Sequence, residues 1–414
     1  MNLIYHVGLY LFNFLLLVAS PFNKRAKLWI RGRRGIYGQI ADKLQENERR
    51  IWIHAASLGE FEQGRPIIEE IKRQSPHFKI VLTFFSPSGY EIRKDYQHVD
   101  YVFYLPLDTS SNAKKFINLV KPEFVIFIKY EFWHNFLKTL KNQKIPTFLA
   151  SAIFRKDQAF FQWYGKWYKK ILDSFNWFFV QNEESKILLE KIGFQNITIS
   201  GDTRFDRVFE IAQQVKSFPI IEEFAKNNFV IILGSSWKAD EEILFDYINN
   251  ESNNIKFIIA PHEIQESNIL RIIKNISKKT IRYSKADEAI AIDYEVLIVD
   301  NIGMLSSIYQ YGTVAYIGGG FGSGIHNILE PATFGLPVLF GPDYHKFQEA
   351  IDLIEQGGAF EVNSKKMATE KLDKLFIDKK YCTAAGIICK KYVEDNKGAT
   401  QIILNHVQKH FNKE

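Results

Sequence analysis

The glycine-rich segment Gly318–Pro342 (GGGFGSGIHNILEPATFGLPVLFGP) carries residue types that suit phosphate binding, and it directly follows the apolar run Val314–Ile317. Glycine lets a backbone approach a phosphate closely, and a helix beginning near Asn327 would point its amide groups at that anion. Glu330 suits a ribose, because one carboxylate accepts from two neighbouring hydroxyls, and Pro331 is tolerated in a first helical turn. The alternative is a glycine-rich turn with an ordinary glutamate. We predict that this segment holds the nucleotide of an activated donor.

A second candidate is His54–Glu60 (HAASLGE), where the apolar run Ile51–Ala55 ends and a helical pattern begins. At this position Glu60 would be placed to take a proton from an acceptor hydroxyl as a general base. A glutamate in a first helical turn is also favoured by the helix dipole alone. Taken by itself, the motif fits that simpler explanation better.

Five further motifs follow runs that are typical of strands. They are Lys129–Trp133 (KYEFW), Gly201–Asp206 (GDTRFD), Gly234–Trp237 (GSSW), Pro261–Glu263 (PHE) and Asp300–Met304 (DNIGM). Each alone is better explained as a turn or a cap, but loops after the strands of a parallel sheet share one edge, where ligands bind. No Asp-x-Asp pair follows a strand and no His or Cys cluster has metal-ligand spacing. We therefore predict a transfer that needs neither metal nor cofactor, with Lys, Arg and helix dipoles neutralising the leaving phosphate.

Short apolar runs alternate with helical patterns along the whole chain, which predicts parallel sheets. The expected strands are Ile51–Ala55, Ile80–Phe84, Val102–Leu105, Phe124–Ile128, Thr147–Ala150, Phe178–Gln181, Val230–Leu233, Lys256–Ala260, Val296–Val299, Val314–Ile317 and Val338–Phe340. Helices are expected over Glu62–Gln74, Phe132–Lys141, Glu183–Ile192 and about Ala385–Phe411. We predict an α/β protein with two Rossmann-like, doubly wound domains facing a central cleft.

The pattern weakens between residues 207 and 227, where Pro219 interrupts a mixed-charge stretch. We place the domain boundary there, because 414 residues exceed what one core normally supports. The predicted parts are a membrane anchor (1–22), an N-terminal domain (23–212), a linker (213–227), a C-terminal domain (228–395) and a C-terminal helix (396–414) that is long enough to pack back on the N-terminal domain.

The stretch Tyr5–Phe22 (YHVGLYLFNFLLLVASPF) has no Asp, Glu, Lys or Arg, and a basic run follows it. Its length suffices either to cross a bilayer or to lie in the interface. A secretory signal fits less well, because no Lys or Arg precedes the apolar run and Pro21 follows its only small-residue cleavage candidate. Positive charge after such a segment indicates the cytoplasmic side. The basic residues are Lys24, Arg25, Lys27, Arg31, Arg33 and Arg34.

Composition narrows the function classes. The hydrophobic share of 46% and the charged share of 24% are those of a folded globular protein. The formal net charge of +6 is small for this length and gives no case for nucleic acid. Cys382 and Cys389 have a spacing that suits neither a zinc site nor a disulfide framework, so we expect free thiols in a reducing compartment.

Together these segments resemble the Kdo transferases, which are inverting glycosyltransferases of the GT-B fold. They move 3-deoxy-D-manno-octulosonic acid (Kdo) from CMP-Kdo onto a lipid A precursor in lipopolysaccharide biosynthesis. The resemblance runs nearly end to end, from the amino-terminal anchor through HAASLGE, EFW, GDTRFD and GSSW to HNILEPATFGLPVLFGP. It implies an enzyme at the bacterial inner membrane, with its catalytic domains on the cytoplasmic side.

The resemblance also implies roles for individual residues. Glu60 resembles the catalytic base, and Glu131 and Arg204 match positions that support the transition state. Three residues depart from the family pattern, which often has Arg at His262, Glu at Met304 and Lys at Arg204. The implied CMP contacts are Pro261, His262, Ile302, Gly303, Met304, Asn327, Ile328, Leu329 and Glu330.

Two alternatives remain open at this point. One is another GT-B nucleotide-sugar enzyme, such as lipid A disaccharide synthase or a UDP-GlcNAc epimerase, which shares the Glu near a Pro in the second domain but not HAASLGE with EFW. The other is a two-domain protein that binds an anion without turnover. For such a protein, replacing Glu60 by Gln would leave function intact.

Overall fold

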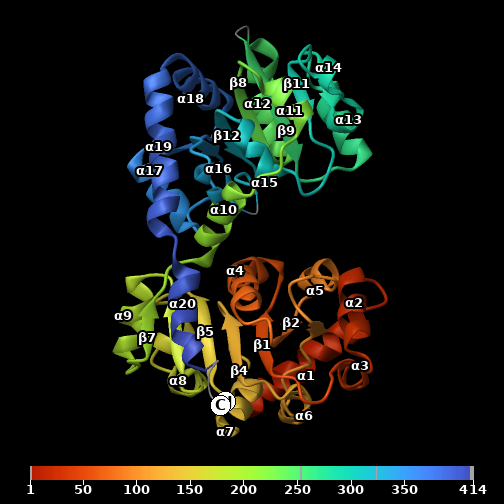
Figure 1. The fold of residues 1–414 in the computed structure, drawn as a ribbon, viewed down its shortest axis with the longest axis vertical. Coiled ribbons are helices and arrows are strands. Elements are labelled where there is room, and N and C mark those ends of the chain that lie inside the picture. Colours follow the sequence, from red (N-terminus) through yellow and green to blue (C-terminus); the bar gives the residue numbers. More distant parts are fainter. Residues whose placement is uncertain (1, 252–253, 323, 411–414) are drawn as a thin grey trace. The chain divides into compact units, whose positions relative to one another are not determined.

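The computed structural model describes residues 2–251, 254–322 and 324–410. The chain divides into two compact units, which are described separately. Unit 1 comprises Met1–Asp206 and Lys397–Glu414, and unit 2 comprises Arg207–Asn396. Each unit is built around one parallel sheet of seven strands (Figure 1).

The sheet of unit 1 has the strand order β3-β2-β1-β4-β5-β6-β7. Its strands are β1 (Arg50–Ala55), β2 (Lys79–Phe84), β3 (Tyr101–Tyr104), β4 (Phe124–Ile128), β5 (Thr147–Ala152), β6 (Trp177–Val180) and β7 (Ile197–Ile199). Its helices up to the end of β7 are α1 (Asn2–Ala19), α2 (Lys24–Arg33), α3 (Ile36–Lys43), α4 (Leu58–Gln74), α5 (Pro87–Arg93), α6 (Ser110–Val120), α7 (His134–Asn142), α8 (Lys166–Leu172) and α9 (Glu183–Lys191).

Both faces of this sheet are buried. Ile51 and Ile53 of β1 belong to one hydrophobic cluster, whereas Trp52 between them belongs to another. Alternate side chains of a strand point to opposite faces, so apolar residues at consecutive positions require helices on both sides. This is why the strands were visible in the sequence as continuous apolar runs, and β1 to β6 lie within two residues of their predicted limits. The three-residue β7 was not predicted, because it is too short to show a pattern.

Unit 2 has the strand order β10-β11-β9-β8-β12-β13-β14. Its strands are β8 (Phe229–Ser236), β9 (Ile255–Pro261), β10 (Thr280–Arg282), β11 (Val296–Ile298), β12 (Val314–Ile317), β13 (Val338–Phe340) and β14 (Ala359–Glu361). Its helices are α11 (Pro219–Ala225), α12 (Lys238–Asn250), α13 (Glu266–Lys274), α14 (Glu288–Ala291), α15 (Leu305–Ile308), α16 (Leu329–Thr333), α17 (Gln348–Gln356), α18 (Lys365–Ile377) and α19 (Lys379–Asn396). The three-residue strands β10 and β14 were not predicted.

The two sheets share a core arrangement of six strands. In unit 1 the core order is β3-β2-β1-β4-β5-β6, with β7 added at one edge, and in unit 2 it is β11-β9-β8-β12-β13-β14, with β10 added at the other edge. The first strand of each core lies beside the fourth, so β1 pairs with β4 and β8 pairs with β12. At this switch point the chain crosses to opposite faces, and the loops after these two strands leave room for a ligand. The predicted doubly wound fold class is confirmed.

The prediction of a single C-terminal helix over Ala385–Phe411 is wrong. The structure has α19 and a separate α20 (Ala399–Val407), divided at Gly398 with φ 112°, and Phe411 lies outside the described residues. The Asp206 carboxylate holds the start of α20, because it accepts hydrogen bonds from the Gly398 and Thr400 amides at 2.5 and 2.7 Å. Helix α20 packs against α4 and contributes Ile403, Leu404 and Val407 to the core of unit 1.

The chain passes from unit 1 to unit 2 through α10 (Thr203–Gln213). The following helix α11 begins at Pro219, which fits the first turn because proline has no amide hydrogen to leave unbonded. The interruption that the sequence placed at Pro219 is therefore the start of a helix.

At the amino terminus, the apolar helix α1 is followed by the basic helix α2. Within the described part of the chain, none of the helices alone has the length and hydropathy needed to cross a membrane. The pair Leu3–Ala19 and Lys24–Arg33, bent by 118°, meets those criteria only when the two helices are taken together.

Candidate active site

In unit 1, the loops after β1 and β4 carry HAASLGE and KYEFW to the switch point of the sheet. Glu60 is the third residue of α4, and its half-buried carboxylate accepts a hydrogen bond from the hydroxyl of Ser57, the residue that precedes the helix. The Ser57 hydroxyl therefore orients the carboxylate. Gly59, which lies between Ser57 and Glu60 in the sequence, is exposed, so the start of α4 is accessible to a ligand.

Glu131 lies at the end of a hydrogen-bonded chain that crosses the sheet. The Trp52 indole donates to the Thr83 hydroxyl at 2.7 Å, and this hydroxyl lies 2.8 Å from His54 Nδ1. His54 Nε2 lies 3.0 Å from the Glu131 carboxylate, which also accepts from the Trp133 indole at 2.6 Å. Because His54 is buried and Trp133 is half-buried, these two side chains fix one oxygen of Glu131 in place.

Arg204 is held by a bidentate contact with Asp202. Its Nε and Nη2 lie 2.8 and 2.7 Å from the same carboxylate oxygen, and its amide donates to the other oxygen at 2.9 Å. Asp202 is buried, whereas about a quarter of the Arg204 side chain is exposed, 27%. The guanidinium is thus oriented by the Asp202 carboxylate.

Tyr130 links these residues electrostatically. Burial raises the pKa of its hydroxyl above the ordinary value. Arg155 and Arg204 oppose this rise in the pKa through their positive charges. The negative charges of Glu60 and Asp202 add to it. The charges of Glu60 and Arg204 therefore both act on the residue that precedes Glu131. Arg155 was missed in the sequence, because it stands three residues beyond β5 in a segment without a motif.

In unit 2, the glycines after β12 mostly pack against the protein's own backbone. A Cβ on Gly318 would overlap the carbonyl of Ser235, and a Cβ on Gly320 would lie 2.5 Å from the amide nitrogen of Gly341. Gly322, by contrast, has no atom within 4 Å of such a Cβ. Only part of the glycine-rich segment is thus open for a ligand, and the rest is glycine because neighbouring loops cross it closely.

Three aromatic rings form a cluster beside this loop, in which His262 stacks on both Trp237 and His326, and those two rings lie side by side with centroids 6.3 Å apart. Trp237, which follows β8, stacks on His262 at a centroid distance of 4.3 Å, and His262 stacks on His326 at 4.7 Å. The Trp237 indole also donates to His326 Nε2 at 2.9 Å. Burial lowers the pKa of His326, and the charge of His262 lowers it further. His326 was within a quoted motif but received no role from the sequence.

The segment after this histidine holds the proposed ribose ligand. The Asn327 side chain accepts from the Leu329 amide at 3.1 Å and donates to Glu330 at 3.2 Å. The helix expected near Asn327 begins at Leu329 and has five residues, so it is much shorter than a typical helix. Ile328 and Leu329 are buried, and Glu330 is half-buried. Burial raises the pKa of the Tyr309 hydroxyl, and the negative charge of Glu330 raises it further. Tyr309 was missed in the sequence.

The remaining predicted donor residues lie on two loops of the same unit. Pro261 ends β9 next to Ser236 of β8, and the His262 amide donates to the Ser236 carbonyl at 2.9 Å. In the loop after β11, Ile302 is 86% exposed, Gly303 has φ 84° and Met304 is buried. An isoleucine so exposed is available to contact a ligand, whereas the Met304 side chain contributes to packing.

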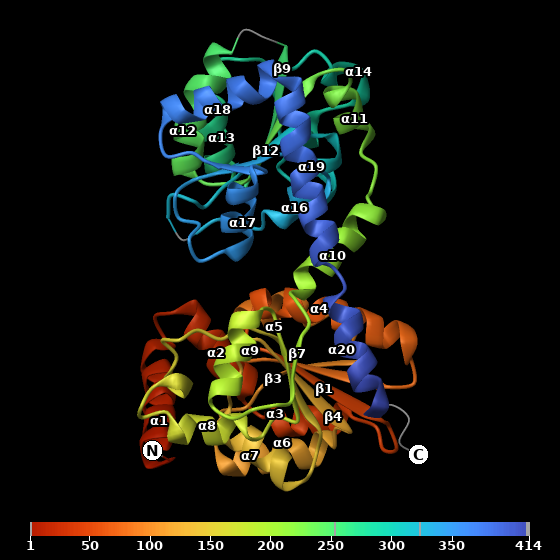
Figure 2. The same ribbon diagram turned by 90° about the vertical axis from the view of Figure 1, so that its left-hand side faces the viewer.

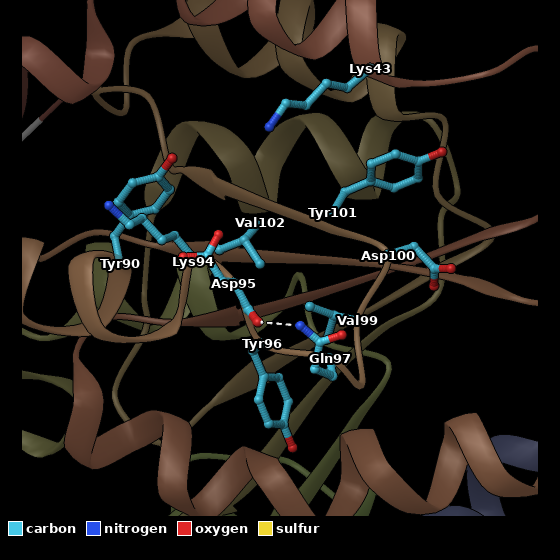
Figure 3. A pocket seen from close by; sticks show the side chains of 10 residues that line it. All are labelled: Lys43, Tyr90, Lys94, Asp95, Tyr96, Gln97, Val99, Asp100, Tyr101 and Val102. Atoms are coloured by element: carbon cyan, nitrogen blue, oxygen red, sulfur yellow. Dashed lines mark hydrogen bonds between the residues drawn. The ribbon is translucent and has the colours of Figure 1, made fainter.

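Two hollows lie near the edges of these sheets. One of about 350 Å³ lies between the start of α12 and the glycine-rich loop, and its lining includes Trp237, Lys238 and Gly322. The other, of about 610 Å³, lies in unit 1 beside β3 (Figure 3), where Lys43 extends towards it and Asp100 is bound by Lys72 and Lys79. The first hollow shares Trp237 with the aromatic cluster and lies at the switch point of its sheet.

Among the described residues, no group of three or more His, Cys, Asp and Glu side chains is arranged to hold a metal ion. Cys382 and Cys389 are both free and buried. Burial raises the pKa of the Cys389 thiol to about 12, so this thiol stays protonated and unreactive.

Two solved structures illustrate which fold this chain shares. The chain is similar to the UDP-GlcNAc 2-epimerase from Neisseria meningitidis, with a TM-score of 0.62 and 16% identity, covering 87% of this chain and 100% of the other. It is also similar to MurG from Acinetobacter baumannii, with a TM-score of 0.56 and 11% identity, covering 87% of this chain and 99% of the other. At these identities the likeness shows the fold alone, which is the GT-B fold with two Rossmann-like domains.

Sequence comparisons point to one activity among the proteins of this fold. The profile "3-Deoxy-D-manno-octulosonic-acid transferase (kdotransferase)" matches residues 30–207. The 3-deoxy-D-manno-octulosonic acid transferase of Aquifex aeolicus is 29% identical over 347 residues, which are 82% of this chain and 89% of that protein. The enzyme of the same name from Haemophilus influenzae is 26% identical over 406 residues, 94% of this chain and 92% of that protein. These matches support a Kdo transferase, a glycosyltransferase of lipopolysaccharide biosynthesis.

Proposed function

We propose that this enzyme transfers Kdo from CMP-Kdo to a lipid A precursor with inversion at the anomeric carbon, and that Glu60 is the general base. The observation that carries this proposal is the position of the Glu60 carboxylate, which is half-buried at the start of α4 and accepts a hydrogen bond from the Ser57 hydroxyl. A carboxylate in such a place has the orientation that proton abstraction requires and the access to an acceptor hydroxyl.

The proposed reaction is a single displacement. Glu60 takes the proton of a hydroxyl on the lipid's glucosamine disaccharide, and that oxygen forms a bond to the anomeric carbon of Kdo. The bond between this carbon and the phosphate oxygen breaks, and CMP leaves with the electron pair from the opposite face. One base suffices, because a single in-line displacement inverts the configuration.

Glu131 and Arg204 are proposed to support the transition state. Glu131 is held by His54 and Trp133 through one oxygen, so its second oxygen has a fixed direction. Arg204 has its guanidinium oriented by Asp202, and 27% of its side chain is exposed. A fixed cation suits negative charge that develops on a departing phosphate, and such preorganised groups supply much of the barrier reduction in enzymes.

Unit 2 is proposed to bind CMP-Kdo. Glu330 would accept from the ribose hydroxyls, while Asn327, Ile328 and Leu329 shape the loop around it. Pro261, His262 and the residues Ile302, Gly303 and Met304 would contribute the other contacts to CMP, with Met304 acting through its backbone. The hollow of about 350 Å³ beside the open Gly322 falls in the size range of small-molecule sites.

The proposed reaction needs no metal and no cofactor. Cationic side chains and backbone amides would stabilise the leaving CMP instead. We also propose that the enzyme is associated with the cytoplasmic face of the bacterial inner membrane through α1 and the basic run 24–34, where its lipid acceptor presents its sugar head.

One assay tests this function. The purified full-length protein is incubated with CMP-Kdo and the lipid A precursor, with and without a chelator, and the product mass is measured. We expect a mass increase corresponding to whole Kdo units, unchanged by the chelator, and an inverted anomeric configuration by NMR. A product only without the chelator would disprove metal independence, and no product with an active donor would overturn the acceptor assignment.

A further inference from the structure

One side of helix α1 is attached to unit 1 near its amino-terminal end. The Tyr5 hydroxyl donates to the carboxylate of Asp108 at 2.5 Å, and Asp108 is fully buried. The Tyr5 ring also packs against His134 and Trp167, with centroid distances of 5.6 and 5.7 Å. The start of this apolar helix is therefore bound to a polar group in the interior of the globular unit.

The same side of α1 is attached again two turns further along. The Phe12 ring lies 5.8 Å from that of Trp29 and 6.1 Å from that of Phe85. Seven residues separate Tyr5 from Phe12, which is about 10 Å along a helix axis, so α1 lies lengthwise on unit 1. A helix that crosses a bilayer has to leave the globular unit and traverse about 30 Å of hydrocarbon. Tyr5 and Phe12 cannot both keep these contacts in that arrangement.

The opposite side of α1 is a continuous apolar surface. Its side chains recur every three or four residues, which is the spacing of one helical face. All of them are exposed, and Leu3 at the start and Phe14 further along are exposed by 77% and 60%. We call this set the apolar stripe; it consists of Leu3, Ile4, Val7, Leu11, Phe14, Leu15 and Val18.

Two further exposed features belong to elements that neighbour α1. Trp163 is 91% exposed and precedes α8, whose Trp167 packs on Tyr5, and Figure 2 shows α8 beside α1. Tryptophan prefers the boundary between headgroups and acyl chains. On α2, which follows α1 directly, the basic side chains of Lys24, Arg25, Lys27 and Arg31 are exposed. Exposed cations beside an apolar surface are complementary to an anionic bilayer.

We propose that α1 does not cross the membrane but lies in its interface, with the apolar stripe in the acyl boundary and the amino terminus on the same side as both globular units. This inference rests on the proposed membrane association, and it is independent of the proposed chemistry. It assigns Trp163 to the same bilayer-facing surface, and it makes the bound side of α1 part of the enzyme's fold.

The location of the amino terminus tests this arrangement. A protease-cleavable epitope tag is added before Met1, and cleavage is compared in spheroplasts and in inside-out membrane vesicles. An interfacial helix gives cleavage only in the inside-out vesicles. Cleavage in intact spheroplasts would overturn the proposal, because a spanning α1 with the basic run in the cytoplasm places the tag outside. Neither result depends on Kdo transfer, so a failure of the proposed function is read separately in the transfer assay.

Binding to lipid tests the apolar stripe. The full-length double variant Leu11→Glu, Phe14→Glu and the control Ile377→Glu, an exposed residue of unit 2, are floated with vesicles of phosphatidylglycerol and phosphatidylethanolamine. Each stripe substitution should weaken partitioning roughly tenfold or more, since burying such a side chain contributes about 1.5–3 kcal/mol, and the control should bind as the parent does. Equal binding of all three would overturn the proposal. So would loss of a dimer rather than of vesicle binding, which would mean that a second copy covers the stripe.

Discussion

Helices α4 and α12 begin at equivalent places in the two sheets, and each carries an acidic residue at its third position. In unit 2, Asp240 is buried and accepts hydrogen bonds from the Trp237 and Gly319 amides at 3.0 and 2.9 Å and from the Tyr316 hydroxyl at 3.0 Å. In unit 1, Glu60 is half-buried and receives its hydrogen bond from the Ser57 side chain. Equivalent positions thus hold two acids that differ in burial and in hydrogen-bond partners.

The difference bears on the simpler explanation of Glu60 as a capping residue. Asp240 has the contacts expected of a capping residue, because its carboxylate accepts hydrogen bonds from an amide at the helix start and from an amide of the neighbouring loop. Burial raises the pKa of Asp240, and the hydrogen bonds from Gly319, Trp237 and Tyr316 oppose that rise. Glu60 has no comparable set of amide donors among the described contacts. A carboxylate with remaining acceptor capacity is available for a substrate proton.

The largest expected effect separates these two acids. Glu60→Gln should lower the rate of Kdo transfer by about 10² or more, the usual cost of losing a general base, while CMP affinity and thermal stability stay near those of the parent. Asp240→Asn should instead lower the free energy of unfolding by roughly 1–3 kcal/mol, because an amide cannot accept from all the buried donors. The measurements are product mass over time, calorimetric CMP binding and denaturant unfolding. Retained transfer in Glu60→Gln would show that the two acids are both caps.

A second comparison separates chemistry in unit 1 from donor binding in unit 2. Glu330→Ala should weaken CMP binding by roughly tenfold to a hundredfold, since hydrogen bonds to a charged group contribute about 1.5–3 kcal/mol. Glu355→Ala, a change of an exposed glutamate in the same unit, is the matched control. Titration calorimetry with CMP measures both. An unchanged affinity in Glu330→Ala would make Glu330 a structural partner of Asn327.

Glu131 tests whether the buried hydrogen-bonded chain is a structural feature as well. Glu131→Ala leaves the His54 and Trp133 donors without their acceptor, which should lower the free energy of unfolding by roughly 1–3 kcal/mol. Glu131→Gln keeps an oxygen that can accept from both, so its stability should stay close to the parent's while transfer slows. Denaturant unfolding and the transfer assay together distinguish the two variants. A Gln variant with full activity would remove the negative charge from the proposed mechanism.

The GDTRFD motif shows where sequence reasoning reaches its limit. Its residues were treated as one candidate site, yet the structure divides them by task. Arg204 and Asp202 form the oriented ion pair, whereas Asp206 caps α20, nearly two hundred residues away in the chain. Nothing in the local pattern indicates this, because the partner of Asp206 is set by tertiary packing.

The glycine-rich segment shows the same limit. The fold was predictable because every core strand except the three-residue β14 contains a continuous apolar run. The motifs that follow β1, β4, β8 and β12 lie at the switch points of the two sheets. The share of glycines needed for packing was not predictable, because the crossings of Gly318 over Ser235 and of Gly320 over Gly341 depend on long-range geometry. Tyr309 and Arg155 were missed for a related reason, since neither stands in a motif.

A smaller effect is expected for the cap of α20. Asp206→Ala should lower the free energy of unfolding of unit 1 by about 1 kcal/mol, the typical cost of losing a helix cap. Hydrogen exchange of the α20 amides should increase selectively. Asp206→Asn, which keeps an oxygen acceptor, is the control and should lose less. If transfer fell far more than stability in both variants, Asp206 would belong with the catalytic residues of unit 1 instead.

The smallest effect concerns the indoles at the two switch points. Trp133 donates to a carboxylate in unit 1, whereas Trp237 donates to His326 Nε2 in unit 2, which requires the neutral form of that imidazole. With its pKa lowered, His326 stays neutral in the fold while the unfolded chain still takes up a proton near its ordinary pKa of about 6.5. Stability is therefore lost as the pH falls below that value.

Trp237→Phe keeps a ring in the aromatic cluster but removes the indole N–H that donates to His326. The His326 pKa should then rise towards its ordinary value, because protonation no longer sacrifices a hydrogen bond, and the loss of stability on acidification should shrink. Imidazole NMR titration of the parent and the variant measures the change, and Trp177→Phe, an indole of unit 1 bonded to Thr198, is the control. An unchanged His326 titration would mean that burial and His262 alone keep the imidazole neutral, so that the Trp237 indole serves only as a stacking surface.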